Sequence, residues 1–147
     1  MQNKLRFKNI IAIFCFGLLL TSCASFSGQL SYFDENTYDN LTKLKPRVSL
    51  LYQSFGEAKL DLSEIRTIRL LLAQAHEYEK GKGSGNVATA KQFELILKSF
   101  EDHIKNRLNK GPWAEFDIED FSENMNEFFN IAISTEGLKN RQWNEGE

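Results

Sequence analysis

The chain has 147 residues, of which 41% are hydrophobic and 26% are charged, and its formal net charge at neutral pH is −2. This length is sufficient for one compact domain. The negative balance also makes nucleic acid and anionic lipid surfaces poor partners.

The N-terminal segment begins with basic residues and continues with an apolar run. Lys4, Arg6 and Lys8 precede the run, which covers residues 10–20. This order is typical of an export signal. A membrane-spanning helix needs about 20 apolar residues, and the run is shorter. We therefore expect residues 1–22 to be a cleaved signal peptide and not a permanent membrane helix.

The residues after the run carry a more specific signal. Leu20-Thr21-Ser22-Cys23 resembles the cleavage motif of bacterial lipoprotein precursors, in which leucine and two small residues precede a cysteine. The resemblance covers residues 1–23 only. It implies a diacylglycerol and an N-acyl chain, such as palmitate, on Cys23, and two or more acyl chains hold a protein firmly on a membrane. Ala24 implies the outer membrane, facing the periplasm, because family members kept in the inner membrane usually carry Asp there.

Cleavage changes the charge and the cysteine content of the mature chain. It removes three basic residues and Cys15, so 20 acidic side chains face 15 basic ones and Cys23 is the remaining cysteine. Once Cys23 is acylated no disulfide can form, which is unusual for a small exported domain. Residues 23–33 are rich in serine and small residues and are predicted to be a tether. Ten flexible residues span roughly 17 Å.

The first helix is predicted over residues 35–55, between a cap at Asp34 and a stop at Gly56. Pro46 lies inside the helical pattern without shifting its phase, so we expect one helix kinked at Pro46 and not two separate helices. The apolar residues share one face, flanked by Tyr38 and Tyr52. They are Leu41, Leu44, Val48, Leu51 and Phe55.

The second helix is predicted over residues 62–80. Asp61 and Glu64 have the spacing of a capping box, and Leu60 and Ile65 that of a hydrophobic staple. The apolar stripe consists of Ile65, Ile68, Leu72 and Ala75, with Leu71 beside it. The glycines of residues 81–86 end the helix. This segment lacks the Gly-Lys-Ser/Thr order of a phosphate-binding loop, so no nucleotide is expected.

Two further helices are predicted beyond these glycines. One covers residues 87–109, with Asn86 or Thr89 as its cap and Gly111-Pro112 as its stop. Its apolar face comprises Phe93, Ile96, Leu97, Phe100, Ile104 and Leu108. The other is capped by Asp117, with Phe116 and Phe121 as its staple pair, and stops at Gly137. Its stripe comprises Phe121, Met125, Phe128 and Ala132, widened by Phe129 and Ile133.

Four amphipathic helices, short connections and little strand signal predict an all-α fold. We expect a single antiparallel four-helix bundle over residues 34–137 and a polar tail over residues 138–147.

Residue patterns for catalysis and for metal binding are missing from the sequence. His76 and His103 are predicted to lie roughly 18 Å apart along the bundle axis, at 1.5 Å per residue, which is too far to share a metal or a haem. The glutamates of a di-iron bundle are replaced by Ala73 and Phe100. Cys23 is committed to lipid, and no Gly-x-Ser-x-Gly elbow exists. We expect no enzyme, no metal and no cofactor other than the lipid.

One charge pattern suggests a binding surface. Between Gly111 and Leu138 the chain has seven acidic residues and no basic one, whereas the third helix is rich in lysine. These acids either form a solvated face partly paired with that helix, or an acidic docking surface for a basic partner. The aromatic residues near helix ends either close the core or line a groove for an apolar helix. The candidate partner-binding residues are Glu115, Asp117, Glu119, Asp120, Glu123, Trp113 and Trp143.

The sequence therefore predicts a membrane-anchored periplasmic lipoprotein that acts as a non-catalytic protein-binding or accessory module. Its expected partners are the membrane, through the anchor, and another envelope protein, but no nucleic acid. Two alternatives stay open. One is an exclusion or immunity lipoprotein that blocks phage or plasmid entry. The other is a module similar to the helical pilot lipoproteins of secretion systems, which share its size, anchor and helix count.

Overall fold

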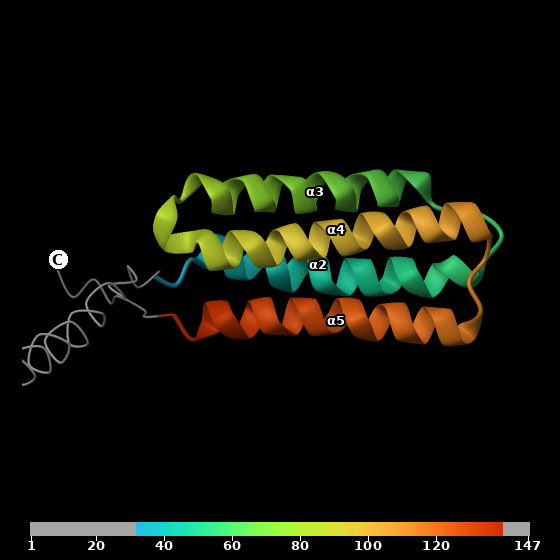
Figure 1. Cartoon of the computed structure of the whole chain (residues 1–147). Helices are drawn as coiled ribbons and strands as arrows, with labels where there is room; N and C mark the ends of the chain where they lie inside the picture. Colours follow the sequence, from blue (N-terminus) through green and yellow to red (C-terminus); the bar gives the residue numbers. More distant parts are fainter. Residues whose placement is uncertain (1–31, 140–147) are drawn as a thin grey trace, which may run out of the picture.

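The structure is a computed structural model that describes residues 32–139. This part of the chain is an all-α bundle of four helices, as predicted (Figure 1). Two short 3₁₀ turns also occur: η1 lies in the α2–α3 connection and η2 in the α3–α4 connection. The elements are α2 (Glu35–Gln53), η1 (Ser54–Gly56), α3 (Leu62–Gly81), η2 (Ser84–Asn86), α4 (Val87–Lys110) and α5 (Glu115–Gly137).

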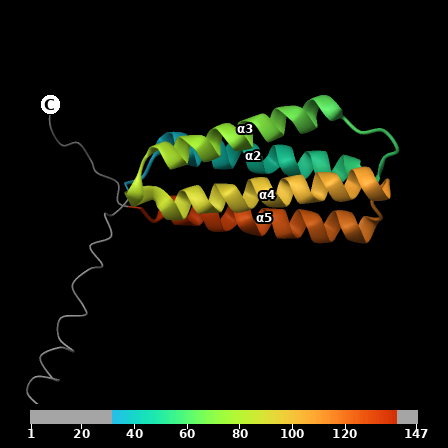
Figure 2. The ribbon, with the colours of Figure 1, turned by 45° about the horizontal axis from the view of Figure 1, so that its top comes forward.

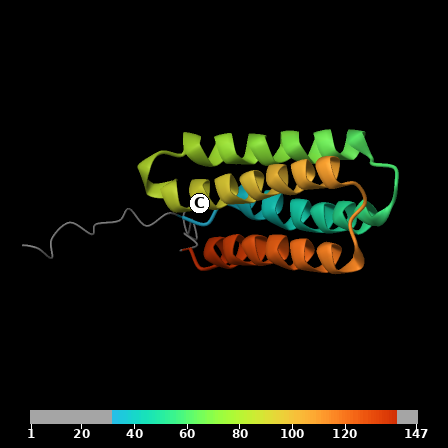
Figure 3. The same ribbon diagram turned by 45° about the vertical axis from the view of Figure 1, so that its right-hand side comes forward.

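The four helices form a ring in which each helix is antiparallel to its two neighbours. Helix α3 packs against α4, α4 against α5, α5 against α2, and α2 against α3 (Figures 2 and 3). The start of α2, the finish of α5 and the α3–α4 turn lie together at one end, which we call the terminal end (Figure 1). The α2–α3 and α4–α5 connections lie at the other end, which we call the distal end.

Helix α2 starts where the sequence predicts. The Asp34 side chain accepts hydrogen bonds from the backbone N–H groups of Asn36, at 2.8 Å, and Thr37, at 3.1 Å. The helix continues without a break through Pro46, which confirms one helix, while the bend at that residue stays a prediction. All five apolar residues of the predicted stripe are buried, and Tyr52 beside them is fully buried as well.

The predicted face of α3 is also buried, and Asp61 caps the helix by accepting from the Glu64 N–H at 2.9 Å.

In α4 one predicted core residue is wrong. Leu108 is exposed, and its neighbour Arg107 is buried instead. The Arg107 guanidinium donates to the carbonyl oxygens of Phe55, at 2.8 Å, and Glu57, so its burial leaves the polar group satisfied.

Helix α5 begins earlier than predicted. Its N-cap is Ala114, and Asp117 is the third helical residue, whose carboxylate accepts from the Ala114 N–H at 3.2 Å. The predicted staple of Phe116 is therefore wrong, because Phe116 points to solvent. Trp113 and Ile118 occupy the staple positions relative to the observed cap.

The buried stripe of α5 includes Phe129 where the sequence predicts Phe128. Phe129 is fully buried, whereas Phe128 packs only at the edge of the core.

Candidate functional site

Two of the predicted functional residues, Cys23 and Trp143, lie outside the described residues. The lipid attachment at Cys23 therefore stays a prediction. Within residues 32–139, no helix has the length and apolar character that a membrane crossing requires.

The acidic segment lies on the outer side of α5. Glu115, Glu119, Asp120 and Glu123 are exposed, and Asp117 is half-buried beside the backbone of Ala114. Among residues 32–139, none of these five carboxylates forms an ion pair with a lysine of α4. The partial pairing that the sequence suggested is therefore not found there, and the charges of this surface face solvent. We call these five residues the acidic face.

Trp113 lies apart from the acidic face, in the core at the distal end. Its indole N–H donates to the Asn106 side-chain oxygen at 3.2 Å, and its backbone N–H donates to the Phe55 carbonyl at 2.9 Å. Its ring centroid is 4.8 Å from that of Phe55 and 4.6 Å from that of Phe121. The ring closes the core, and a partner cannot reach it in the folded bundle.

The two histidines have different surroundings. His103 packs against the same aromatic cluster, and its Nδ1 is 2.9 Å from the Tyr52 hydroxyl. Burial lowers the pKa of His103, and the nearby carboxylates of Asp102 and Asp120 oppose this effect only in part. His103 is thus neutral at pH 7. His76 lies on α3 in a surface depression. Within the described part of the chain, no three ligating side chains gather to hold a metal.

A buried polar network, which the sequence did not predict, occupies the terminal end. Its centre is Glu79 of α3, which is fully buried. The Glu79 carboxylate accepts from the Thr37 hydroxyl at 2.5 Å, from the Lys82 ammonium at 3.0 and 3.1 Å, and from the Asn86 amide. Lys82 also pairs with Asp34 at 2.8 Å. One carboxylate therefore joins α2, α3 and the α3–α4 turn.

A second buried carboxylate extends this network to the last helix. Glu136 of α5 is fully buried, and it accepts from the backbone N–H of Asp34 at 2.8 Å. Lys139 pairs with Glu136 at 2.5 Å and donates to the side chains of Asn86, at 3.1 Å, and Thr89, at 2.9 Å. The residues just before α2 and just after α5 are thus both fixed to the α3–α4 turn.

The ionisation of this network follows from its contacts. Burial raises the pKa of Asp34, but hydrogen bonds from Lys82, Tyr78 and the Thr37 amide outweigh it, so the net shift is downward. Burial lowers the pKa of Lys82, yet the bonds to Asp34 and Glu79 outweigh it, so the net shift is upward. Both groups therefore stay charged at neutral pH.

A signal for this network does exist in the sequence. Glu79 continues the buried stripe of α3 four residues after Ala75, and Glu136 continues that of α5 four residues after Ala132. Each glutamate is followed three residues later by a lysine, which places a cation on the same side of the helix. A carboxylate in phase with an apolar stripe indicates a buried, paired charge.

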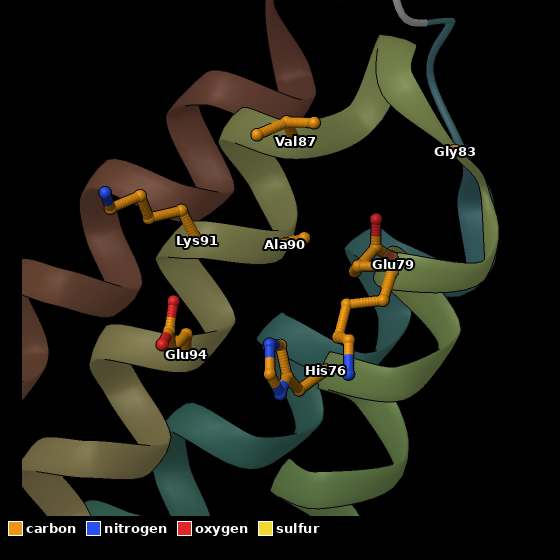
Figure 4. Close-up of a pocket in the computed structure, with 8 residues that line it drawn as sticks. His76, Glu79, Gly83, Val87, Ala90, Lys91 and Glu94 are labelled. Atoms are coloured by element: carbon orange, nitrogen blue, oxygen red, sulfur yellow. The ribbon is translucent and has the colours of Figure 1, made fainter.

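Two surface depressions lie between neighbouring helices. The first, between α3 and α4 near the terminal end, has a volume of about 470 Å³. Figure 4 shows His76 and Glu79 of α3 across from Lys91 and Glu94 of α4, with Val87 and Ala90 above them. The second has a volume of about 540 Å³, and most of its lining is polar or charged: Arg47, Leu50, Leu51, Ser54, Glu57, Lys59, Asp61 and Glu64.

Neither depression resembles the apolar groove that an apolar partner helix requires. These two surfaces therefore give no support to the similarity with pilot lipoproteins.

No protein-family model matches the chain, and no curated protein or solved structure matches it.

Proposed function

We propose that the mature chain is a lipid-anchored, non-catalytic binding module of the bacterial periplasm that holds another envelope protein near the outer membrane. The observation that carries this proposal is the Leu20-Thr21-Ser22-Cys23 motif directly after a short apolar run. A chain with this motif is held by acyl chains on Cys23, and the short tether keeps its domain close to the lipid surface.

The acidic face is the surface best suited to the partner. Its carboxylates have no cation within ion-pair distance among the described residues, so their field extends into solvent. An uncompensated acidic surface speeds and orients the approach of a basic partner. The partner class is thus an envelope protein with a basic surface.

The anchor is tested by replacing Cys23 with alanine. We expect Cys23→Ala to abolish palmitate incorporation and to move the protein from the membrane fraction to the soluble periplasmic fraction. Cys15→Ala is the matched control, because Cys15 lies in the segment removed by cleavage and should change neither result. Membrane association that survives Cys23→Ala contradicts the proposed anchor.

The binding role is tested by crosslinking in cells. A photoreactive phenylalanine analogue at Phe116, which is exposed at the start of α5, is expected to capture an envelope protein with a basic surface. The same analogue at Leu70, exposed on α3, is the control and should not capture it. Neutralising the acidic face with Glu119→Gln, Asp120→Asn and Glu123→Gln should reduce capture from Phe116, because the electrostatic attraction is lost.

Two results would contradict the binding role. One is that no envelope protein is captured above background. The other is equal capture from both positions, with no effect of the neutralised face.

A further inference from the structure

The terminal end exposes large apolar side chains from all four helix ends. Tyr32 precedes α2, Tyr78 lies in the last turn of α3, Val87 starts α4 and Leu138 follows α5, and 41–86% of each residue is exposed. The distal end exposes Leu50, Leu62, Leu108 and Phe116 in the same way, so charge and the position of Cys23 decide which end meets a surface. Each of the four residues at the terminal end also lies within two positions in sequence of an Asp34, Glu79, Asn86 or Lys139 side chain of the buried network.

The network connects the segments of the chain that carry three of these side chains. The Tyr78 hydroxyl donates to the Asp34 carboxylate at 2.8 Å, and the Lys82 ammonium lies 4.4 Å from the centre of the Tyr78 ring. Lys139, next to Leu138, is bonded to Asn86, next to Val87. These contacts therefore fix the Tyr78 side chain directly and join the backbone segments that carry Val87 and Leu138.

Charge is distributed unevenly between the two ends of the bundle. At the terminal end, Asp34 and Glu79 share Lys82, and Glu136 pairs with Lys139, so the exposed Glu35 is the carboxylate there without an ion pair among residues 32–139. Four exposed carboxylates of the acidic face, which form no ion pair with the described part of the chain, lie instead toward the distal end of α5. The terminal end can thus approach a surface of low dielectric at a smaller electrostatic penalty than the distal end.

Cys23 lies a short distance before the terminal end in sequence, so the surface that we expect this end to contact is the lipid surface. Cys23 precedes Tyr32 by nine residues, a stretch that spans at most about 31 Å when fully extended and roughly 17 Å as a typical coil. Helix α4, with 24 residues, is about 36 Å long at 1.5 Å per residue. An acylated Cys23 therefore keeps the terminal end near the bilayer and the distal end far from it when the bundle stands upright.

We propose that the terminal end rests on the lipid headgroup layer, with Tyr32, Tyr78, Val87 and Leu138 in contact with it. Tyrosine suits this position because its ring is apolar while its hydroxyl keeps a polar partner. The acidic face then points toward the periplasm, available to a partner. This inference rests on the proposed lipid anchor, and it adds a fixed orientation of the domain.

The test places one environment-sensitive fluorophore at either end of α4. Val87 is 61% exposed at the terminal end and Leu108 is 58% exposed at the distal end, so they form a matched pair. In lipidated protein Cys23 is blocked, and Val87→Cys or Leu108→Cys supplies the single free thiol for labelling with a nitrobenzoxadiazole probe. The labelled proteins are reconstituted into phosphatidylcholine vesicles that contain a headgroup-labelled nitroxide lipid.

We expect the probe at position 87 to shift its emission to the blue and to be quenched by the nitroxide lipid. The probe at position 108 should behave as it does in solution. Leu138→Asp, at an exposed site, should reduce the quenching at position 87 without changing flotation with the vesicles.

Three results overturn the inference. If neither probe responds in protein that floats with the vesicles, the domain hangs free of the surface. If both probes respond, the bundle lies on its side. If the protein does not float, the anchor itself fails, and the proposed function fails with the inference.

Discussion

Replacing Glu79 with alanine is expected to lower the free energy of unfolding by about 3 kcal/mol, the lower limit for removing one partner of a buried ion pair. The substitution removes the acceptor for Thr37, Lys82 and Asn86 at once. Asn86 is buried and keeps the Glu79 backbone carbonyl as an acceptor at 3.4 Å, so the substitution removes the closer of these two bonds. Lys82 keeps Asp34 as a partner, so we expect the decrease in the free energy of unfolding to stay near this lower limit of about 3 kcal/mol. Urea unfolding of the mature Cys23→Ala chain, followed by circular dichroism, measures the effect.

Glu77→Ala is the matched control for this prediction. Glu77 lies two residues before Glu79 on the same helix, and it pairs with Lys80 at 2.8 Å on the exposed surface. Exposed pairs of this kind contribute little to stability. We therefore expect no measurable shift of the urea midpoint for Glu77→Ala. Equal shifts for the two variants would mean that the network at the terminal end does not stabilise the fold.

Local sequence signals were sufficient to predict most of the fold. Asp34 and Asp61 are good caps followed by clear apolar periodicity, and Gly111 ends α4 with a positive φ of 87° that suits glycine. These signals act within one or two turns of a helix. Their outcome therefore does not depend on how the helices pack.

The error in the core of α4 arose where two neighbouring residues satisfied the same local rule. Arg107 and Leu108 both fit the helical phase set by Phe100 and Ile104. Packing decided between them, because the carbonyls of Phe55 and Glu57 at the distal end accept hydrogen bonds from a buried guanidinium. Such tertiary partners cannot be read from the sequence around residue 107.

The same reasoning explains the candidate site. The acidic face near the start of α5 could be placed on the surface from composition and helical spacing, whereas Glu136 near its other end is fully buried. Whether lysines of α4 would pair with the acidic face depended on how the two helices are rotated, and the structure leaves its carboxylates facing solvent. The buried network joins residues 34 and 136, which are far apart in sequence, so only the closed bundle brings them together.

Replacing Trp113 with alanine is expected to lower the free energy of unfolding by about 3–5 kcal/mol, the usual effect of removing a large aromatic side chain from a core. Trp113 is 5% exposed, and the change removes its ring contacts with Tyr52, Phe55 and Phe121 together with the bond to Asn106. Phe116→Ala is the control. Phe116 is 75% exposed on the neighbouring turn, and a change within about 0.5 kcal/mol is expected there.

Urea unfolding of both variants separates a core role for Trp113 from a binding role. If Trp113 has a core role, the Trp113→Ala variant unfolds at a lower urea concentration, whatever partner is present, because the lost contacts lie inside the bundle. If Trp113 has a binding role instead, the substitution would leave the unfolding curve unchanged and abolish capture of the partner in cells. The second result would contradict the packing described for the distal end. The first would leave the exposed acidic face of α5 as the part of this segment that a partner can reach.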